Sequence, residues 1–168
     1  VMVTGMGIIS PLGLDVESTW DGIVNGRSGV DLITSFDTEG FDTHFAAEVK
    51  GFDPENHLER KEARRMDRFA QFAAVAAQQA CAQAGLERGT VDPYRVGVII
   101  GSGIGGISTL SQQHEILIER GPKRVSPFLI PMMLGDMASA QVSMVTGSMG
   151  ANYCLVSSCS SGADALGQ

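Results

Sequence analysis

The chain has 168 residues, 43% of them hydrophobic and 18% charged, so it can bury a core and is not a disordered tail. Its longest apolar runs are too short to span a bilayer, and no hydrophobic leader opens the sequence. The net charge of −7 argues against nucleic acid as a general partner, because a protein that binds phosphates needs a basic face. Three cysteines without metal-site or disulfide spacing favour a reducing compartment, and we expect a cytoplasmic location.

The first part of the chain predicts a strand, a turn and a helix. Residues 1–7 are largely apolar and end in glycine, which is typical of a strand, and Ser10-Pro11-Leu12-Gly13 follows as a turn. The spacing of apolar residues after Asp15 predicts a helix that this aspartate caps and that Asn25-Gly26 ends.

The middle of the chain holds a less regular stretch and then the clearest helix. Residues 27–57 lack a helical period, so we expect short strands and loops there, with 45–49 as the best strand. In 62–84, apolar residues recur at spacings of three and four, which predicts a helix that Gly85 stops. The many alanines of this helix imply close packing on both sides.

The last part of the chain alternates strands with helices. Residues 96–100 form a continuous apolar run, as expected of a central strand that is covered on both faces. Helices are predicted over 110–119 and 132–145, and a last strand over 152–156. This alternation predicts an α/β fold, layered, with a mostly parallel sheet and covering helices.

Cys159 is the candidate nucleophile, because the sequence around it predicts a buried strand that turns sharply into a helix. A thiol at the first turn of a helix meets unpaired N–H groups and the positive end of the helix dipole, which favour the thiolate. The small residues 160–162 would let an acyl group and a developing oxyanion approach the backbone. The alternative is a buried structural cysteine, which is how Cys154 and Cys81 are interpreted.

A glycine-rich segment, Gly101-Ser102-Gly103-Ile104-Gly105-Gly106, follows the predicted strand at 96–100. Its glycines match the dinucleotide-binding pattern, but that pattern requires an acidic residue at the end of a second strand ~20 residues on. Residues 112–120 are instead polar and helix-like. We therefore expect no dinucleotide cofactor, and interpret the glycines as allowing close approach of another backbone or of an acyl chain.

Five of the twelve basic residues fall within nine positions of this acidic chain. Four of them are spaced to share one helical face, which is unfavourable unless something acidic docks there. The alternative is a solvated face that nearby carboxylates balance in part. The basic residues are Arg60, Lys61, Arg64, Arg65 and Arg68, and the carboxylates are Glu59, Glu62 and Asp67.

The three histidines, His44, His57 and His114, lie in polar surroundings, and none has the spacing of a metal site. We expect surface positions for them and no metal. None can be paired with Cys159 as its base from sequence.

Together these segments resemble one family, the β-ketoacyl-[acyl carrier protein] synthases, and most closely the synthase II type of bacterial fatty acid synthesis. The resemblance runs essentially from end to end and rests on several separate matches in the right order. These are Val3-Thr4-Gly5-Met6-Gly7, Ser10-Pro11-Leu12-Gly13, Arg65-Met66-Asp67-Arg68-Phe69, the glycine-rich segment, Ser126-Pro127-Phe128 and the segment around Cys159.

The resemblance implies a thiolase-like fold of two similar halves, with residues 1–168 as the N-terminal half, truncated at both ends. Cys159 matches the cysteine that is acylated, and its backbone N–H would form half of the oxyanion hole. The implied reaction is a decarboxylative Claisen condensation of an acyl thioester with malonyl-carrier protein, without a cofactor. The family's catalytic histidines and lysine belong to the other half, so we expect this chain alone to be inactive.

The resemblance also assigns binding residues. Ile104 matches a residue that lines the acyl pocket, and Phe128 and Leu129 match a stretch near that pocket at the interface of a homodimer. Basic positions that receive the acidic acyl carrier protein match three residues here, Lys61, Arg64 and Arg65.

Two alternatives remain within the resemblance. Ser158 stands where the family more often has alanine, which leaves the subtype open, and a polyketide ketosynthase would share the nucleophile but differ in its acyl pocket. A non-catalytic partner subunit of a ketosynthase heterodimer normally lacks the cysteine, so Cys159 argues against that role.

Overall fold

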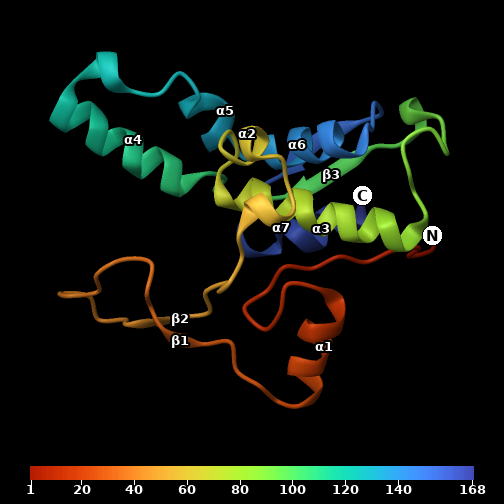
Figure 1. Ribbon diagram of the computed structural model, residues 1–168, viewed down its shortest axis with the longest axis horizontal. Coiled ribbons are helices and arrows are strands. Elements are labelled where there is room, and N and C mark those ends of the chain that lie inside the picture. Colours follow the sequence, from red (N-terminus) through yellow and green to blue (C-terminus); the bar gives the residue numbers. More distant parts are fainter.

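The structure is a computed structural model that describes all residues, 1–168. Short 3₁₀ turns lie at 54–56, 93–95, 122–124 and 158–160. The helices and strands labelled in Figure 1 are, in chain order, α1 (Val16–Val24), β1 (Asp31–Leu32), β2 (Phe45–Ala46), α2 (Arg60–Ala63), α3 (Arg68–Ala84), β3 (Val98–Gly101), α4 (Ile107–Arg120), α5 (Leu129–Met133), α6 (Met137–Thr146), β4 (Asn152–Leu155) and α7 (Ser161–Gly167).

Strands β3 and β4 form the parallel pair that carries the site. Their register runs from Val98 opposite Asn152 to Gly101 opposite Leu155. Helices α6 and α7 both pack against this pair, and α3 packs against α6. The strands predicted at 96–100 and 152–156 and the α/β layering are therefore confirmed, with β3 beginning at Val98 and β4 ending at Leu155. The second sheet is a short antiparallel pair of β1 and β2, shorter than the predicted strand at 45–49.

The core forms where α3 meets α6. Ala70 and Ala74 on α3 and Ala138 on α6 are almost fully buried, and their small side chains allow the backbones to approach closely. The N-terminal segment of the chain also packs tightly against α3, since a Cβ atom on Gly5 would lie 2.1 Å from the carbonyl oxygen of Ala80. The predicted close packing around this helix is confirmed. The core cluster consists of Phe52, Leu58, Ala63, Met66, Ala70, Ala74, Val75 and Ala138.

The predicted strand at 1–7 is wrong for this chain, because these residues pair with no other strand. Side chains of α3 instead accept hydrogen bonds from backbone N–H groups of the N-terminal segment. The N–H of Met6 donates to Oε1 of Gln83 at 2.6 Å, and the N–H of Ile8 donates to Oε1 of Gln79 at 3.1 Å.

The predicted helix at 62–84 is also wrong as a single helix, because α2 ends at Ala63 and α3 begins at Arg68. Asp67 starts the second helix by accepting a hydrogen bond from the N–H of Phe69. The apolar period continues across the break, since Ala63 and Met66 are buried in the same core as α3. Gly85 ends α3 with φ +64°, as predicted. Likewise, the predicted helix at 132–145 is divided into α5 and α6.

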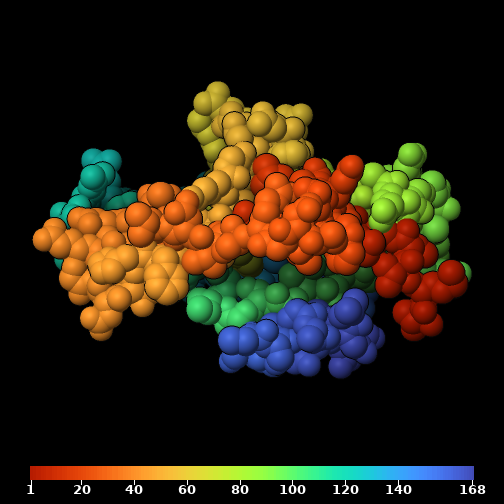
Figure 2. All heavy atoms as spheres, turned by 90° about the horizontal axis from the view of Figure 1, so that it is seen from below, coloured from red at the N-terminus to blue at the C-terminus, as the bar shows by residue number.

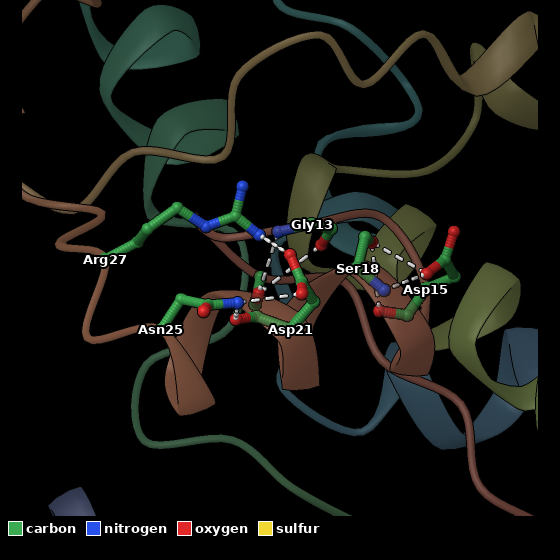
Figure 3. Close-up of polar contacts among 7 residues, drawn as sticks. Gly13, Asp15, Ser18, Asp21, Asn25 and Arg27 are labelled. Atoms are coloured by element: carbon green, nitrogen blue, oxygen red, sulfur yellow. Dashed lines mark hydrogen bonds and ion pairs between the residues drawn. The ribbon is translucent and has the colours of Figure 1, made fainter.

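Helix α1 is confirmed with its predicted caps. The side chain of Asp15 accepts a hydrogen bond from the N–H of Ser18 at 2.7 Å, and Asn25 is the C-cap. Figure 3 shows Asn25 and Arg27 both reaching the carboxylate of Asp21 at the other end of the helix. None of the helices is long and apolar enough to cross a membrane.

Candidate active site

The candidate site lies where β3 and β4 end. Parallel strands deliver the loops that follow them to one edge of the sheet. The N–H of Ser102, just after β3, donates to the carbonyl oxygen of Leu155 at 3.2 Å, so the glycine-rich loop and the Cys159 turn start side by side. A Cβ atom on Gly101 would lie 2.1 Å from the carbonyl oxygen of Ser161. Glycine therefore allows β3 to pack directly against the start of α7.

The interpretation of the glycines as a place of close backbone approach is confirmed. A Cβ atom on Gly103 would lie 3.3 Å from the carbonyl oxygen of Ser158, and one on Gly105 would lie 2.6 Å from that of Met133. The N–H of Gly106 donates to the carbonyl oxygen of Met133 at 2.9 Å. In a dinucleotide site this N–H group would donate to the pyrophosphate, but here it donates to the backbone of α5.

Cys159 lies at the predicted bend. β4 ends at Leu155, a 3₁₀ turn covers 158–160, and α7 begins at Ser161, so the cysteine precedes the helix instead of lying in its first turn. Ser158 has φ +56°, a left-handed conformation that costs an L-residue about 1–2 kcal/mol. The sharp reversal presents Cys159 to solvent.

The other two cysteines differ from Cys159 as predicted. Cys154 in β4 and Cys81 in α3 are half-buried. Burial raises the pKa of the Cys81 thiol, which disfavours the reactive thiolate.

Serine side chains hold the Cys159 turn together. The buried Ser161 hydroxyl accepts a hydrogen bond from the N–H of Ser157 at 2.9 Å and donates to the carbonyl oxygen of Ser158 at 2.7 Å. The Ser160 hydroxyl donates to the carbonyl oxygen of Ser157 at 2.8 Å, and the Ser157 hydroxyl donates to the Asp164 carboxylate. The sequence predicts a role for residues 160–162 only because they are small. The signal that this prediction missed is that serine readily bonds to nearby backbone at a helix start.

The predicted acyl-pocket residues lie on two segments that are joined by a hydrogen bond. Ile104 is 73% exposed in the glycine-rich loop. Phe128 and Leu129 lie at the start of α5, whose last residue, Met133, accepts the hydrogen bond from Gly106. The Phe128 ring faces the Arg65 guanidinium, with 5.0 Å between the ring centroid and Cζ. That these three residues line an acyl pocket stays a prediction.

The prediction that four basic residues share one helical face is wrong, because the helix is broken between them. Lys61 lies on α2, Arg64 and Arg65 lie in the break, and Arg68 begins α3. Arg68 donates to the carbonyl oxygen of Val49 at 2.9 Å, and its Cζ lies 4.8 Å from the centroid of the Phe72 ring. It is therefore engaged in the fold.

Lys61, Arg64 and Arg65 are exposed and take part in none of the chain's three ion pairs. In Figure 2 the segment around residue 60, coloured yellow, projects from the surface. The chain therefore neutralises none of these three charges by an ion pair, although Arg65 also faces the Phe128 ring.

Asp67 does not balance this charge, contrary to the alternative considered for the basic face. It is 7% exposed, and its Oδ2 accepts hydrogen bonds from the N–H of Thr109 at 3.0 Å and from its Oγ1 at 2.6 Å. The carboxylate thus ties the start of α3 to the start of α4, beside the glycine-rich loop. The sequence carries no signal for this role, because Asp67 lies inside the single helix that is predicted at 62–84.

The three histidines are exposed, as predicted. His44 hydrogen-bonds to Thr38 at 3.0 Å, and His57 stacks on Phe52 with 5.8 Å between ring centroids. His114 lies on α4. No three His, Cys, Asp or Glu side chains gather in a way that could hold a metal ion.

Comparison with known proteins places this arrangement in one family. The family described as beta-ketoacyl synthase, N-terminal domain, matches residues 1–168. The chain is 47% identical over its whole length to 3-oxoacyl-[acyl-carrier-protein] synthase 2 of Staphylococcus aureus (strain COL), and covers 41% of that relative. It is 45% identical over 167 residues to the protein of the same name from Synechocystis sp., covering 99% of this chain and 40% of the relative.

A solved structure shows the same architecture. The ishigamide ketosynthase/chain length factor matches with a TM-score of 0.81 and 28% identity, over 92% of this chain and 39% of that one. The fold is therefore the N-terminal half of the thiolase-like fold of ketosynthases, and the chain spans about two fifths of the length of its relatives. The chain belongs to the beta-ketoacyl synthase family, whose N-terminal domain it matches throughout.

Proposed function

We propose that the protein containing this chain is a 3-oxoacyl-[acyl carrier protein] synthase that elongates fatty acids. The observation that carries the proposal is Cys159, an exposed thiol on a strained turn between a parallel strand and a helix, at the edge of the sheet where the glycine-rich loop also begins. The names of relatives that are 45–47% identical over the chain support this activity. The S–H groups of three free cysteines fit a cytoplasmic location.

Cys159 is the nucleophile in this proposal. Its sulfur attacks the carbonyl of an acyl-carrier thioester, a new thioester forms on Cys159, and the carrier leaves as a free thiol. Malonyl-carrier protein then loses CO₂, and the resulting carbanion attacks the acyl group. A carbon–carbon bond forms as the bond to the Cys159 sulfur breaks, which gives a 3-oxoacyl chain two carbons longer.

The backbone N–H of Cys159 supplies half of the oxyanion hole in both steps. This N–H donates to no group of the chain, so it is available to the charge that develops on the carbonyl oxygen. The groups that protonate and polarise the malonyl unit belong to the part of the protein beyond this chain, and we expect residues 1–168 alone not to condense.

Two surfaces bind the substrates. Ile104, Phe128 and Leu129 line the acyl pocket at a homodimer interface, supported by the hydrogen bond that joins the glycine-rich loop to α5. The acidic acyl carrier protein docks on Lys61, Arg64 and Arg65, whose charges have no ion-pair partner within the chain.

A polyketide ketosynthase and a non-catalytic partner subunit are less well supported. The ishigamide ketosynthase/chain length factor is only 28% identical, against 47% for the 3-oxoacyl-[acyl-carrier-protein] synthase 2 of Staphylococcus aureus. The presence of Cys159 opposes a non-catalytic role.

Intact-mass spectrometry of the full-length protein tests the nucleophile. After incubation with a medium-chain acyl-carrier thioester, we expect one acyl adduct that the variant Cys159→Ala loses. The matched control Cys81→Ala, which removes a half-buried thiol from α3, should keep the adduct. An adduct that persists in Cys159→Ala, or no adduct in the wild type, contradicts the proposal.

A further inference from the structure

The Ser161 hydroxyl is the most buried polar group beside the nucleophile. Ser161 is 3% exposed, although Ser157, Ser158, Cys159 and Ser160 are all exposed. Its oxygen accepts from the N–H of Ser157 at 2.9 Å and donates to the carbonyl oxygen of Ser158 at 2.7 Å. One side chain therefore fixes the backbone on both sides of Ser158, the residue with the left-handed conformation.

The second of these hydrogen bonds determines where the Cys159 N–H points. The Ser158 carbonyl and the Cys159 N–H belong to one peptide unit, and no peptide bond of the chain is cis. In a trans peptide these two groups point in opposite directions. The carbonyl is held toward α7 by both the hydroxyl and the N–H of Ser161. The N–H of Cys159 is thereby aimed away from α7, where it donates to no group of the chain.

Contacts of the glycine-rich loop add to this restraint. A Cβ atom on Gly103 would lie 3.3 Å from the Ser158 carbonyl oxygen, and the carbonyl of Ser161 lies against Gly101. The peptide before Cys159 is thus packed on one side by β3 and its loop, while the hydroxyl and the N–H of Ser161 together set its rotation.

We propose that Ser161 is a positioning residue for the reaction of Cys159. Its hydroxyl orients the peptide between Ser158 and Cys159 so that the Cys159 N–H meets the oxyanion formed during acyl transfer. This assignment rests on the proposed function, because only acyl transfer creates that oxyanion. Donors of an oxyanion hole act through being oriented before charge develops, so losing the restraint should slow acylation more than it affects the thiol.

Two reactions of the same sulfur separate these effects. Acylation by an acyl-carrier thioester passes through an oxyanion, whereas alkylation by iodoacetamide displaces iodide and forms none. In the full-length protein, Ser161→Ala should slow acylation of Cys159 by about 10- to 100-fold, somewhat less than the loss of a whole oxyanion donor. The rate of alkylation and its dependence on pH should stay as in the wild type.

Two further variants complete the test. Ser161→Thr keeps the hydroxyl and should restore acylation. Ser111→Ala, which removes an exposed hydroxyl on α4 that makes no hydrogen bond, is the matched control and should change neither rate. If Ser161→Ala does not fold, Ser161→Cys keeps the shape with a weak donor and acceptor, and peptide mapping then reads alkylation at Cys159 alone.

The outcomes are distinct. Slow acylation with normal alkylation, rescued by threonine, supports the positioning role. Equal loss of both rates means that the hydroxyl only maintains the turn, and unchanged acylation means that it is not needed; either result overturns the assignment. A wild-type protein that is alkylated but never acylated at Cys159 overturns the proposed function itself.

Discussion

At the scale of single residues, two glycines near the site differ in the space around them. A Cβ atom on Gly101 would lie 2.1 Å from the carbonyl oxygen of Ser161, which is backbone and cannot rotate away. We expect Gly101→Ala to lower the free energy of unfolding of the full-length protein by about 3 kcal/mol or more, because β3 must separate from the start of α7. Denaturant unfolding measures this change.

Gly135 offers the matched control. A Cβ atom there would lie 3.7 Å from the Cys154 sulfur, an ordinary van der Waals distance, and its backbone needs no left-handed conformation. Gly135→Ala should therefore change the free energy of unfolding by less than about 0.5 kcal/mol. Equal stability of the two alanine variants would show that β3 does not press against α7.

The identity of the candidate residues could be predicted from sequence, but their surroundings could not. Cys159 stood out because a turn, a helix start and small neighbours coincide there, and its exposure agrees with that prediction. The roles of Ser161 and Asp67 depend on hydrogen bonds to specific backbone atoms of other turns. Such bonds leave no period or spacing in a sequence, and only the position of Ser161 near a predicted helix start gave a signal.

At the scale of elements, the small β1–β2 sheet depends on charged carboxylates. The Glu48 carboxylate, just after β2, accepts from the N–H and Oγ1 of Thr34 at 2.9 and 2.8 Å and from the N–H of Ser35 at 3.1 Å. Hydrogen bonds from Ser35 and Thr34 lower the pKa of Glu48 from 4.5 to about 2. The Lys50 ammonium, 2.6 Å from the Asp31 carboxylate, lowers the pKa of that group as well.

The direction of these pKa shifts sets the pH range in which the two carboxylates stabilise the β1–β2 sheet. A carboxyl whose pKa is lower in the folded state stabilises the fold above its unfolded pKa. For Glu48 this stabilising contribution is complete above about pH 4.5, and it is lost as the pH falls toward about 2. We expect the β1–β2 segment to open first in acid, in that window, and not at neutral pH. Figure 2 shows this segment, in orange, projecting at one end of the molecule.

Thr34→Val tests this account. It removes the hydroxyl that donates to Glu48 at 2.8 Å, so the Glu48 pKa should move up toward 4.5 in an NMR titration of the side-chain carboxyl. Thr43→Val, which removes an exposed hydroxyl without a hydrogen bond, should leave that pKa in place. An unchanged Glu48 titration in Thr34→Val would mean that the sheet is not held by this contact.

Sequence patterns predicted most elements, and two failures have physical causes. The break between α2 and α3 was hidden because Ala63, Met66 and Ala70 keep the helical apolar spacing while the backbone changes direction. Residues 1–7 have the composition of a strand, but a strand needs a partner edge, and within this chain glutamines of α3 take its donors. The spacing of apolar residues predicts which face of a segment is buried, but it does not predict which groups accept the hydrogen bonds of its backbone.

At the scale of the whole molecule, the core is small and much apolar surface stays open. Only 17 of 168 residues are buried, while Trp20, Ile23 and Leu166 are more than half exposed. These three line an apolar hollow of about 530 Å³ between the N-terminal segment, α1 and α7. Exposed apolar surface of this extent is typical of a site that contacts another molecule. The relatives have more than twice the length of this chain, which fits our expectation that it does not act alone.

The distribution of charge over the whole molecule bears on the proposed docking of an acidic carrier. The chain carries a net charge of −7, which repels an acidic protein, so the proposed docking relies on local positive charge at Lys61, Arg64 and Arg65, which are exposed and free of ion pairs. Reversing charge there removes attraction and adds repulsion close to the partner.

In the full-length protein we expect Lys61→Glu combined with Arg64→Glu to raise the Kd for the acyl carrier protein by about tenfold or more at low salt, mainly through slower association. The difference from the wild type should shrink as salt shortens the Debye length from ~10 Å at 0.1 M toward ~3 Å at 1 M. Arg95→Glu, which reverses another exposed arginine without an ion pair, is compared with the single variant Lys61→Glu, because each changes the net charge by −2. Surface plasmon resonance over a salt series measures both rates. Equal weakening by Arg95→Glu and by Lys61→Glu would mean that the carrier senses only net charge, and a loss that persists at high salt would mean that the substitutions damage the fold around α2.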